Sequence, residues 1–98
     1  MKRRQFTLDA RVDTDNPTAV RPVLEKLVAN GLVKPGATDN EFIVRARFDG
    51  ESSKTLNRLF LSSLRRAERR TRMRAEWTST DGTVHRFFDY VLKKTAKA

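Results

Sequence analysis

The sequence contains no cysteine, a single histidine, His85, and four glycines that all stand in turn-like segments. Without cysteine there can be no disulfide bond, thiolate metal site or thiol nucleophile. One histidine excludes a histidine metal cluster, and a catalytic triad would need every partner to converge on His85. The glycines form neither a phosphate-binding loop nor a nucleophile elbow. We therefore predict a non-catalytic protein that uses no cofactor, metal or small-molecule substrate.

Long apolar runs are also missing. The longest, residues 42–44 and 59–61, are far shorter than the ~20 residues that a membrane-spanning helix needs. Residues 1–4 are basic like the start of a secretion signal, but polar residues between positions 5 and 11 interrupt the apolar stretch that should follow. We expect a cytoplasmic protein with no membrane partner.

The chain is long enough for one small domain. We expect its 98 residues to form a single α+β unit, 1–98, with flexible tails at 1–4 and 94–98. Hydrophobic residues make up 38% of the chain and include six phenylalanines and one tryptophan, which is enough for a core. The 21 lysines and arginines outnumber 12 acidic residues, and the resulting net charge of +9 favours acidic partners such as nucleic acid.

Two kinds of periodicity alternate along the chain. Strict alternation of apolar and polar residues is typical of half-buried strands, and a spacing of three and four residues is typical of amphipathic helices. In chain order the patterns predict a strand at 6–12, a helix at about 20–28, a short strand at 32–34, a strand at 41–49, a helix at 53–72 and strands at 73–80 and 83–93. Asp81 and Gly82 predict a tight hairpin between the last two strands.

This order of elements resembles the ferredoxin-like βαββαβ arrangement with an additional C-terminal β-strand. We therefore predict an α+β fold in which two helices pack on one face of an antiparallel sheet. The other face would be open to solvent or to a partner. The pattern at 32–34 is too short to decide whether a strand forms there, and without that strand the topology changes.

Arginine is concentrated in the second predicted helix. With about 100° between successive residues, four arginines fall within about 60° of one another, opposite the apolar stripe. This arginine ridge consists of Arg58, Arg65, Arg69 and Arg72, and the same segment carries Arg66 and Arg70. Neighbouring guanidinium groups repel one another, so the ridge adds little to helix stability.

The arginine ridge has two interpretations. It is either a solvated helix face or a surface that follows a nucleic-acid backbone, because the planar guanidinium fork matches phosphate oxygens. We favour the hypothesis of nucleic-acid binding, with RNA preferred to DNA. The predicted contacts are Arg58, Arg65, Arg66, Arg69, Arg70, Arg72, Arg45 and Arg47.

The open sheet face is expected to be partly apolar. Ile43 lies there with Arg45 and Arg47, which alternate with the core residues of their strand. In the last strand, adjacent aromatic residues point to opposite faces. The outward set is either His85, Phe87 and Val91 or Phe88 and Tyr90. Exposed apolar surface marks interfaces, so the alternative function is a protein interaction or homodimerisation module with Ile43, His85 and Phe87 at its interface.

Asp13 and Asp15 follow the first strand, where paired carboxylates can hold a magnesium ion. A metal-dependent phosphodiesterase is therefore the second alternative. Asp15 and Asn16 before Pro17 are also ordinary residues of a turn and a helix start. That role accounts for them without a metal, so we predict no catalytic residues.

Overall fold

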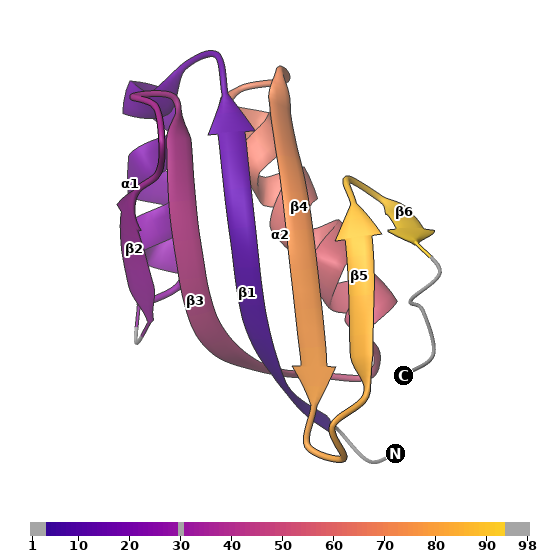
Figure 1. Cartoon of the computed structure of the whole chain (residues 1–98). Helices are drawn as coiled ribbons and strands as arrows, with labels where there is room; N and C mark the ends of the chain where they lie inside the picture. Colours follow the sequence, from indigo (N-terminus) through magenta and orange to yellow (C-terminus); the bar gives the residue numbers. More distant parts are fainter. Residues whose placement is uncertain (1–3, 30, 94–98) are drawn as a thin grey trace.

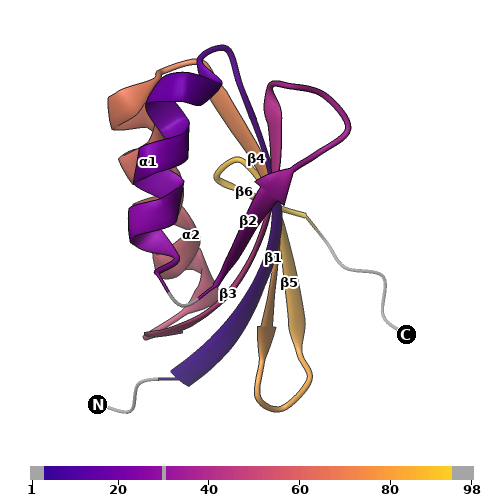
Figure 2. The same cartoon turned by 90° about the vertical axis from the view of Figure 1, so that its left-hand side faces the viewer.

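The computed structural model describes residues 4–29 and 31–93, which form two helices and one antiparallel sheet of six strands. The elements are β1 (Arg4–Thr14), α1 (Pro17–Leu27), β2 (Leu32–Pro35), β3 (Glu41–Gly50), α2 (Ser53–Ala67), β4 (Thr71–Ser79), β5 (Val84–Phe88) and β6 (Val91–Lys93). The strands lie in the order β2-β3-β1-β4-β5-β6 (Figure 1). Both helices cover the same face (Figure 2). The predicted α+β fold is confirmed, whereas the sheet has more strands than expected.

The first strand is the centre of the sheet. As its alternation predicts, β1 buries Phe6, Leu8, Ala10 and Val12 against the helices. It is longer than predicted because it pairs with β3 from Arg4 onward and with β4 as far as Thr14. Of the expected tails, residue 4 therefore belongs to the sheet, and residues 1–3 and 94–98 lie outside the described part.

The first helix begins earlier than its apolar spacing suggests. Asn16 caps it by accepting a hydrogen bond from the Ala19 N–H at 3.2 Å, and Pro17 occupies the first turn, where no N–H is needed. The strand at 32–34, which the sequence leaves open, does form. β2 pairs with β3 from Leu32 to Pro35 and makes one edge of the sheet.

The second helix is shorter than predicted. It starts after its N-cap, Ser52, but ends at Ala67 rather than at residue 72. Glu68 has extended backbone, and its carbonyl accepts a hydrogen bond from the Thr71 hydroxyl at 2.7 Å. Thr71 then pairs with Thr14 across the sheet, and their hydroxyls form a buried hydrogen bond of 3.0 Å. Strand pairing thus overrides the helical preference of this segment.

The single strand predicted at 83–93 is two strands, because the chain reverses at Asp89. This residue has a positive φ of 58°, which aspartate adopts more readily than most residues. Its N–H donates to the Met73 carbonyl at 2.7 Å, and its carboxylate accepts the Met73 N–H at 2.9 Å. Asn57 Nδ2 donates to the Asp89 carbonyl at 2.6 Å. Contacts with distant parts of the chain therefore fix this turn.

The core lies between the helices and the sheet. Trp77, predicted as a core residue, is fully buried, and its ring centre lies 5.7 Å from that of Phe48 and 6.5 Å from that of Phe60. Its indole N–H donates to the buried Asn57 side chain at 3.1 Å. No helix within the described residues is long and apolar enough to cross a membrane.

Candidate nucleic-acid interface

Most of the predicted arginine ridge gathers where α2 ends and β4 begins, although only part of it is helical. Arg65 and Arg66 occupy the last turn of α2, Arg69 and Arg70 lie in the bend that follows, and Arg72 belongs to β4. These five residues, the helix-end cluster, line two adjoining depressions that share Arg65 and Arg69. Arg58 does not belong to it, because it lies about two helical turns from Arg65.

Within the helix-end cluster, Arg65 has a structural role. Its Nε–H donates to the Thr71 carbonyl at 2.9 Å, and its guanidinium pairs with Asp89 at 3.5 Å. The same group lies 5.1 Å from the ring centre of Tyr90. The side chain is only 31% exposed, so Arg65 holds the end of α2 against the β5–β6 turn rather than extending into solvent.

The other four arginines of the cluster are exposed. Arg70 pairs with Asp15 at 3.6 Å, and Arg72 pairs with Asp13 at 3.3 Å. Both pairs are open to water, where an ion pair contributes about 0–1 kcal/mol. Arg66 and Arg69 form no ion pair with any residue of the described ranges.

The two aspartates considered as magnesium ligands take part in these ion pairs. Asp13 and Asp15 each form an ion pair with an arginine. No group of three or more histidine, aspartate or glutamate side chains suited to a metal ion occurs within residues 4–29 and 31–93.

Charged side chains also cover the open face of the sheet. Arg45 on β3 pairs with Asp9 on β1 at 3.5 Å, and Arg86 on β5 pairs with Glu76 on β4 at 3.0 Å. Arg47 is exposed, two residues further along β3. Arg45 and Arg47 thus face away from the helices as predicted, and Arg45 has a carboxylate partner.

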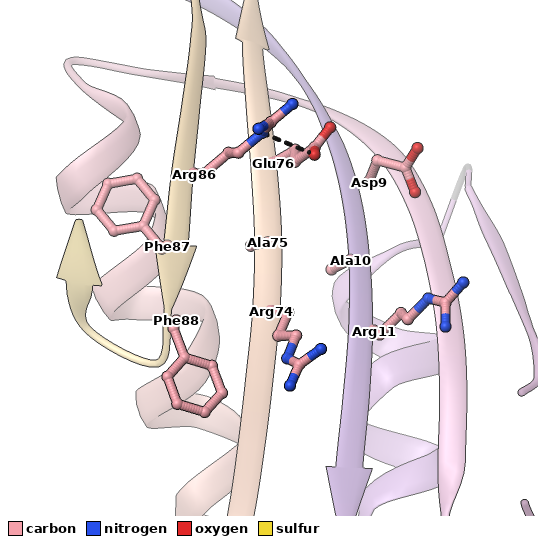
Figure 3. Close-up of a pocket in the computed structure, with 9 residues that line it drawn as sticks. All are labelled: Asp9, Ala10, Arg11, Arg74, Ala75, Glu76, Arg86, Phe87 and Phe88. Carbon is pink, nitrogen blue, oxygen red and sulfur yellow. Dashed lines mark ion pairs between the residues drawn. The ribbon is translucent and has the colours of Figure 1, made fainter. Parts of the chain in front are cut away.

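One position of the open face brings two arginines together. Arg11 on β1 lies directly opposite Arg74 on β4, and neither forms an ion pair with a described residue. The Arg74 guanidinium lies 5.4 Å from the ring centre of the half-buried Phe88. In Figure 3, Arg74 lies between Phe88 and Arg11. These residues line an open depression with a volume of about 540 Å³.

Neither Arg11 nor Arg74 is among the nucleic-acid contacts predicted from the sequence. Alternation places Arg11 on the outward side of its strand, and the same rule applied to β4 places Arg74 outward. The two arginines lie opposite each other because of the register between β1 and β4, and the alternation pattern does not predict that register.

The predicted protein interface does not form a single surface. Ile43 is half-buried on the open face, where its strand position is opposite Arg11. His85 and Phe87 instead lie opposite Trp77 and Ala75, on the face that the helices cover. Phe87 is 3% exposed and belongs to the core. Of the two outward sets that the sequence left open, Phe88 of the second set faces outward on β5, and the prediction that Phe87 lies at an interface was wrong.

Comparison with protein-family models, with curated protein sequences and with solved structures found no match to this chain.

Proposed function

We propose that this protein is a non-catalytic domain that binds nucleic acid, RNA in preference to DNA, in the cytoplasm. The observation that carries the proposal is the helix-end cluster, in which five arginines from a helix, a bend and a strand line two adjoining depressions. Two of them, Arg66 and Arg69, are exposed and form no ion pair with a described residue. Guanidinium groups in this state suit the phosphates of a nucleic-acid backbone.

The ion-paired arginines of the cluster add to this surface. The side chains of Arg70 and Arg72 are 82% and 62% exposed. A pair so open to water is weak, so either arginine can exchange its aspartate for a phosphate at little cost. The cluster can therefore contact a nucleic-acid backbone through four side chains, with Arg65 as a fixed support.

The open sheet face favours a single-stranded ligand, and RNA is the single strand that we propose. Single-stranded RNA is recognised through unpaired bases that stack on aromatic rings or guanidinium planes. The open face offers Phe88 and Arg74 for such contacts, and Arg72 belongs both to the helix-end cluster and to this face. A duplex, whose bases are paired, would use the phosphate contacts alone.

The test is a titration of fluorescently labelled single-stranded and duplex RNA and DNA at several salt concentrations. We expect the affinity for single-stranded RNA to fall with salt, with a slope of about −0.7 per phosphate contact. Arg66→Glu/Arg69→Glu should weaken binding roughly tenfold or more and reduce the slope by roughly 1.4. Arg65 is left unchanged because its loss would disturb the end of α2.

A matched control is Lys26→Glu/Lys54→Glu, which makes the same change of charge far from the cluster. Lys26 lies near the end of α1 and Lys54 in the first turn of α2, and both are exposed. This variant should lose much less affinity. If both variants weaken binding equally, net charge and not the cluster is responsible. If the wild type binds no nucleic acid even at low salt, the proposal is wrong and a protein partner becomes the better account.

We also propose that the chain is a ferredoxin-like domain extended at its C-terminus. The order of its first six elements is βαββαβ. In the sheet, β3 lies between β1 and β2, and β1 lies between β3 and β4, so each βαβ unit is split by another strand. β5 and β6 would then be additions that continue the sheet beyond β4.

A further inference from the structure

Arg11 on β1 and Arg74 on β4 lie directly opposite each other on two central strands, which is an unusual position for two residues of like charge. Residues directly opposite each other on antiparallel strands have Cβ atoms roughly 4.5–5.5 Å apart, and like charges at such positions are destabilising. Like charges also face each other two residues away, where Asp9 lies opposite Glu76, but each of these carboxylates pairs with an arginine of the strand on its other side. Asp9 pairs with Arg45, and Asp13 pairs with Arg72. Only the position between them in β1 leaves two arginines facing each other within the described residues.

The carboxylates nearest this pair are already engaged. Asp9 and Glu76 also line the depression, but Asp9 forms an ion pair with Arg45 and Glu76 forms one with Arg86. The dashed line in Figure 3 marks the second of these pairs. Neither Arg11 nor Arg74 forms an ion pair with a described residue, although carboxylates lie on the same face, and an anion placed between the two arginines would relieve their repulsion. A phosphate suits both guanidinium groups, since each presents a fork of donors.

The shape of the depression indicates which kind of ligand could carry this anion. Its floor is main chain, because the side chains of Ala10 and Ala75 are buried on the other face of the sheet. Its volume of about 540 Å³ falls within the roughly 300–1,000 Å³ of typical small-ligand sites. One wall is Phe88, a half-buried aromatic residue beside Arg74. Besides Asp9 and the Arg86–Glu76 ion pair, the site thus combines two arginines that have no ion pair with an aromatic surface.

We propose that this depression holds one nucleotide of a single-stranded nucleic acid, with its phosphate between Arg11 and Arg74 and its base stacked against Phe88. The inference rests on the proposed nucleic-acid binding and gives it a specific subsite. Base stacking on an aromatic side chain contributes about 1–3 kcal/mol, and any base can supply it. A duplex cannot use the subsite, because its bases are already stacked and paired. Arg72 connects the subsite to the helix-end cluster, so one strand can contact both.

The experiment compares two labelled RNA oligomers of equal length, one of mixed sequence and one with the same backbone but no bases. Fluorescence anisotropy at fixed salt should show that the wild type binds the base-containing strand about tenfold more tightly. Phe88→Leu should remove most of that difference. Arg11→Gln/Arg74→Gln should weaken binding of both strands. Lys26→Gln/Lys54→Gln removes the same charge on the helices and should have a much smaller effect.

The outcomes separate this subsite from the wider proposal. If the wild type binds neither oligomer, the proposed function itself fails. If it binds both equally, or if Arg11→Gln/Arg74→Gln behaves like its charge-matched control, the nucleotide subsite is overturned while binding by the helix-end cluster stands. Tighter binding of duplex than of single-stranded RNA would also overturn it. The comparison of the two oligomers uses the wild-type protein, so it holds even if Phe88→Leu fails to fold.

Discussion

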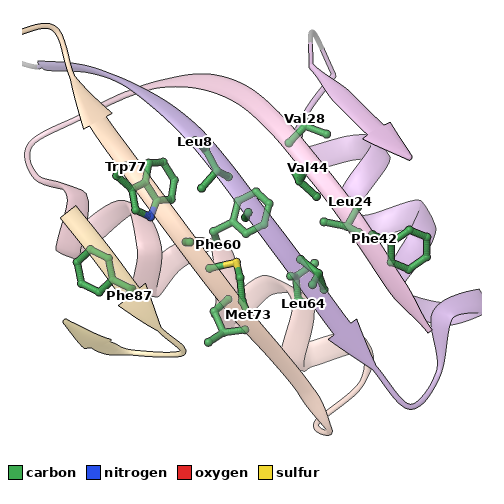
Figure 4. Close-up of a cluster of buried hydrophobic side chains, with 14 of the residues drawn as sticks. Leu8, Leu24, Val28, Phe42, Val44, Phe60, Leu64, Met73, Trp77 and Phe87 are labelled. Carbon is green, nitrogen blue, oxygen red and sulfur yellow. The ribbon is translucent and has the colours of Figure 1, made fainter. Parts of the chain in front are cut away.

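The two faces of the sheet follow different rules although the same strands make both. On the inner face, Leu8, Phe60, Met73 and Trp77 pack together (Figure 4). No buried side-chain nitrogen or oxygen among the described residues lacks a hydrogen-bond partner. On the open face, charged residues form ion pairs across strands, and at one position two arginines face each other (Figure 3). Close packing and complete hydrogen bonding characterise the inner face, whereas the open face keeps two like charges opposite each other.

The largest effect should come from Trp77, at the centre of the inner face. Trp77→Ala removes a fully buried ring and its contacts with Phe48 and Phe60, and should lower the free energy of unfolding by about 3–5 kcal/mol. Urea unfolding followed by far-UV circular dichroism measures it, because the variant lacks the only tryptophan. Thr78→Ala, the next residue but on the open face, should change stability by under about 0.5 kcal/mol. Similar losses of stability in both variants would contradict the difference between the inner and the open face.

A smaller loss is expected at Asn57, which is 1% exposed. Its side chain accepts the Trp77 indole N–H and donates to the Asp89 carbonyl. Asn57→Leu leaves the buried Trp77 N–H and the partly buried Asp89 carbonyl without these hydrogen bonds, and should cost about 1–3 kcal/mol in urea unfolding. Hydrogen exchange should be faster in β6 as well, because Asn57 fixes the turn before it. Unchanged stability would show that the inner face tolerates unpaired polar groups.

On the open face, a substitution should stabilise the protein. Arg11→Gln removes repulsion from Arg74 and breaks no ion pair of the described residues, so unfolding should require up to about 1 kcal/mol more. The gain should shrink in 1 M salt, where charges are screened. Arg86→Gln is the control, because it loses the ion pair with Glu76 and should destabilise by about 0.2–1 kcal/mol. A loss of stability in Arg11→Gln would mean that its charge supports the fold.

The smallest effect concerns Asp81, in the turn between β4 and β5. Its carboxylate accepts hydrogen bonds from the Ser79 hydroxyl and from the Thr83 N–H, which lower its pKa from the usual 3.8 to about 2. Because the pKa is lower in the folded state, the stabilisation is present above about pH 4 and is lost as pH falls through about 2.

Thermal unfolding of the wild type and of Asp81→Asn between pH 7 and pH 2 tests this effect. The wild type should have the higher midpoint at pH 7, and the difference should disappear toward pH 2. A difference that is constant with pH would exclude the carboxylate as its cause. Gly82, whose φ is 89°, is left unchanged because residues other than glycine are strained in that conformation.

Much of the fold could be predicted from local patterns. Alternation identified the inner residues of β1, and the Asp81-Gly82 pair marked the turn between β4 and β5. The same logic correctly directed Arg45 and Arg47 to the open face. These predictions succeed because a strand sends alternate side chains to opposite faces, and a tight turn requires particular residues, whatever the rest of the chain does.

Other features depend on partners distant in sequence. Residues 68–72 suit a helix by composition, but Thr71 pairs with Thr14, and this contact starts a strand. Asp89 reverses the chain because Asn57 and Met73 hold its backbone. Local patterns therefore reveal which residues are apolar, which segments are periodic and how much positive charge the protein carries. That Arg11 faces Arg74 follows from the folded arrangement of the strands, because strand register is set by packing between segments far apart in the chain.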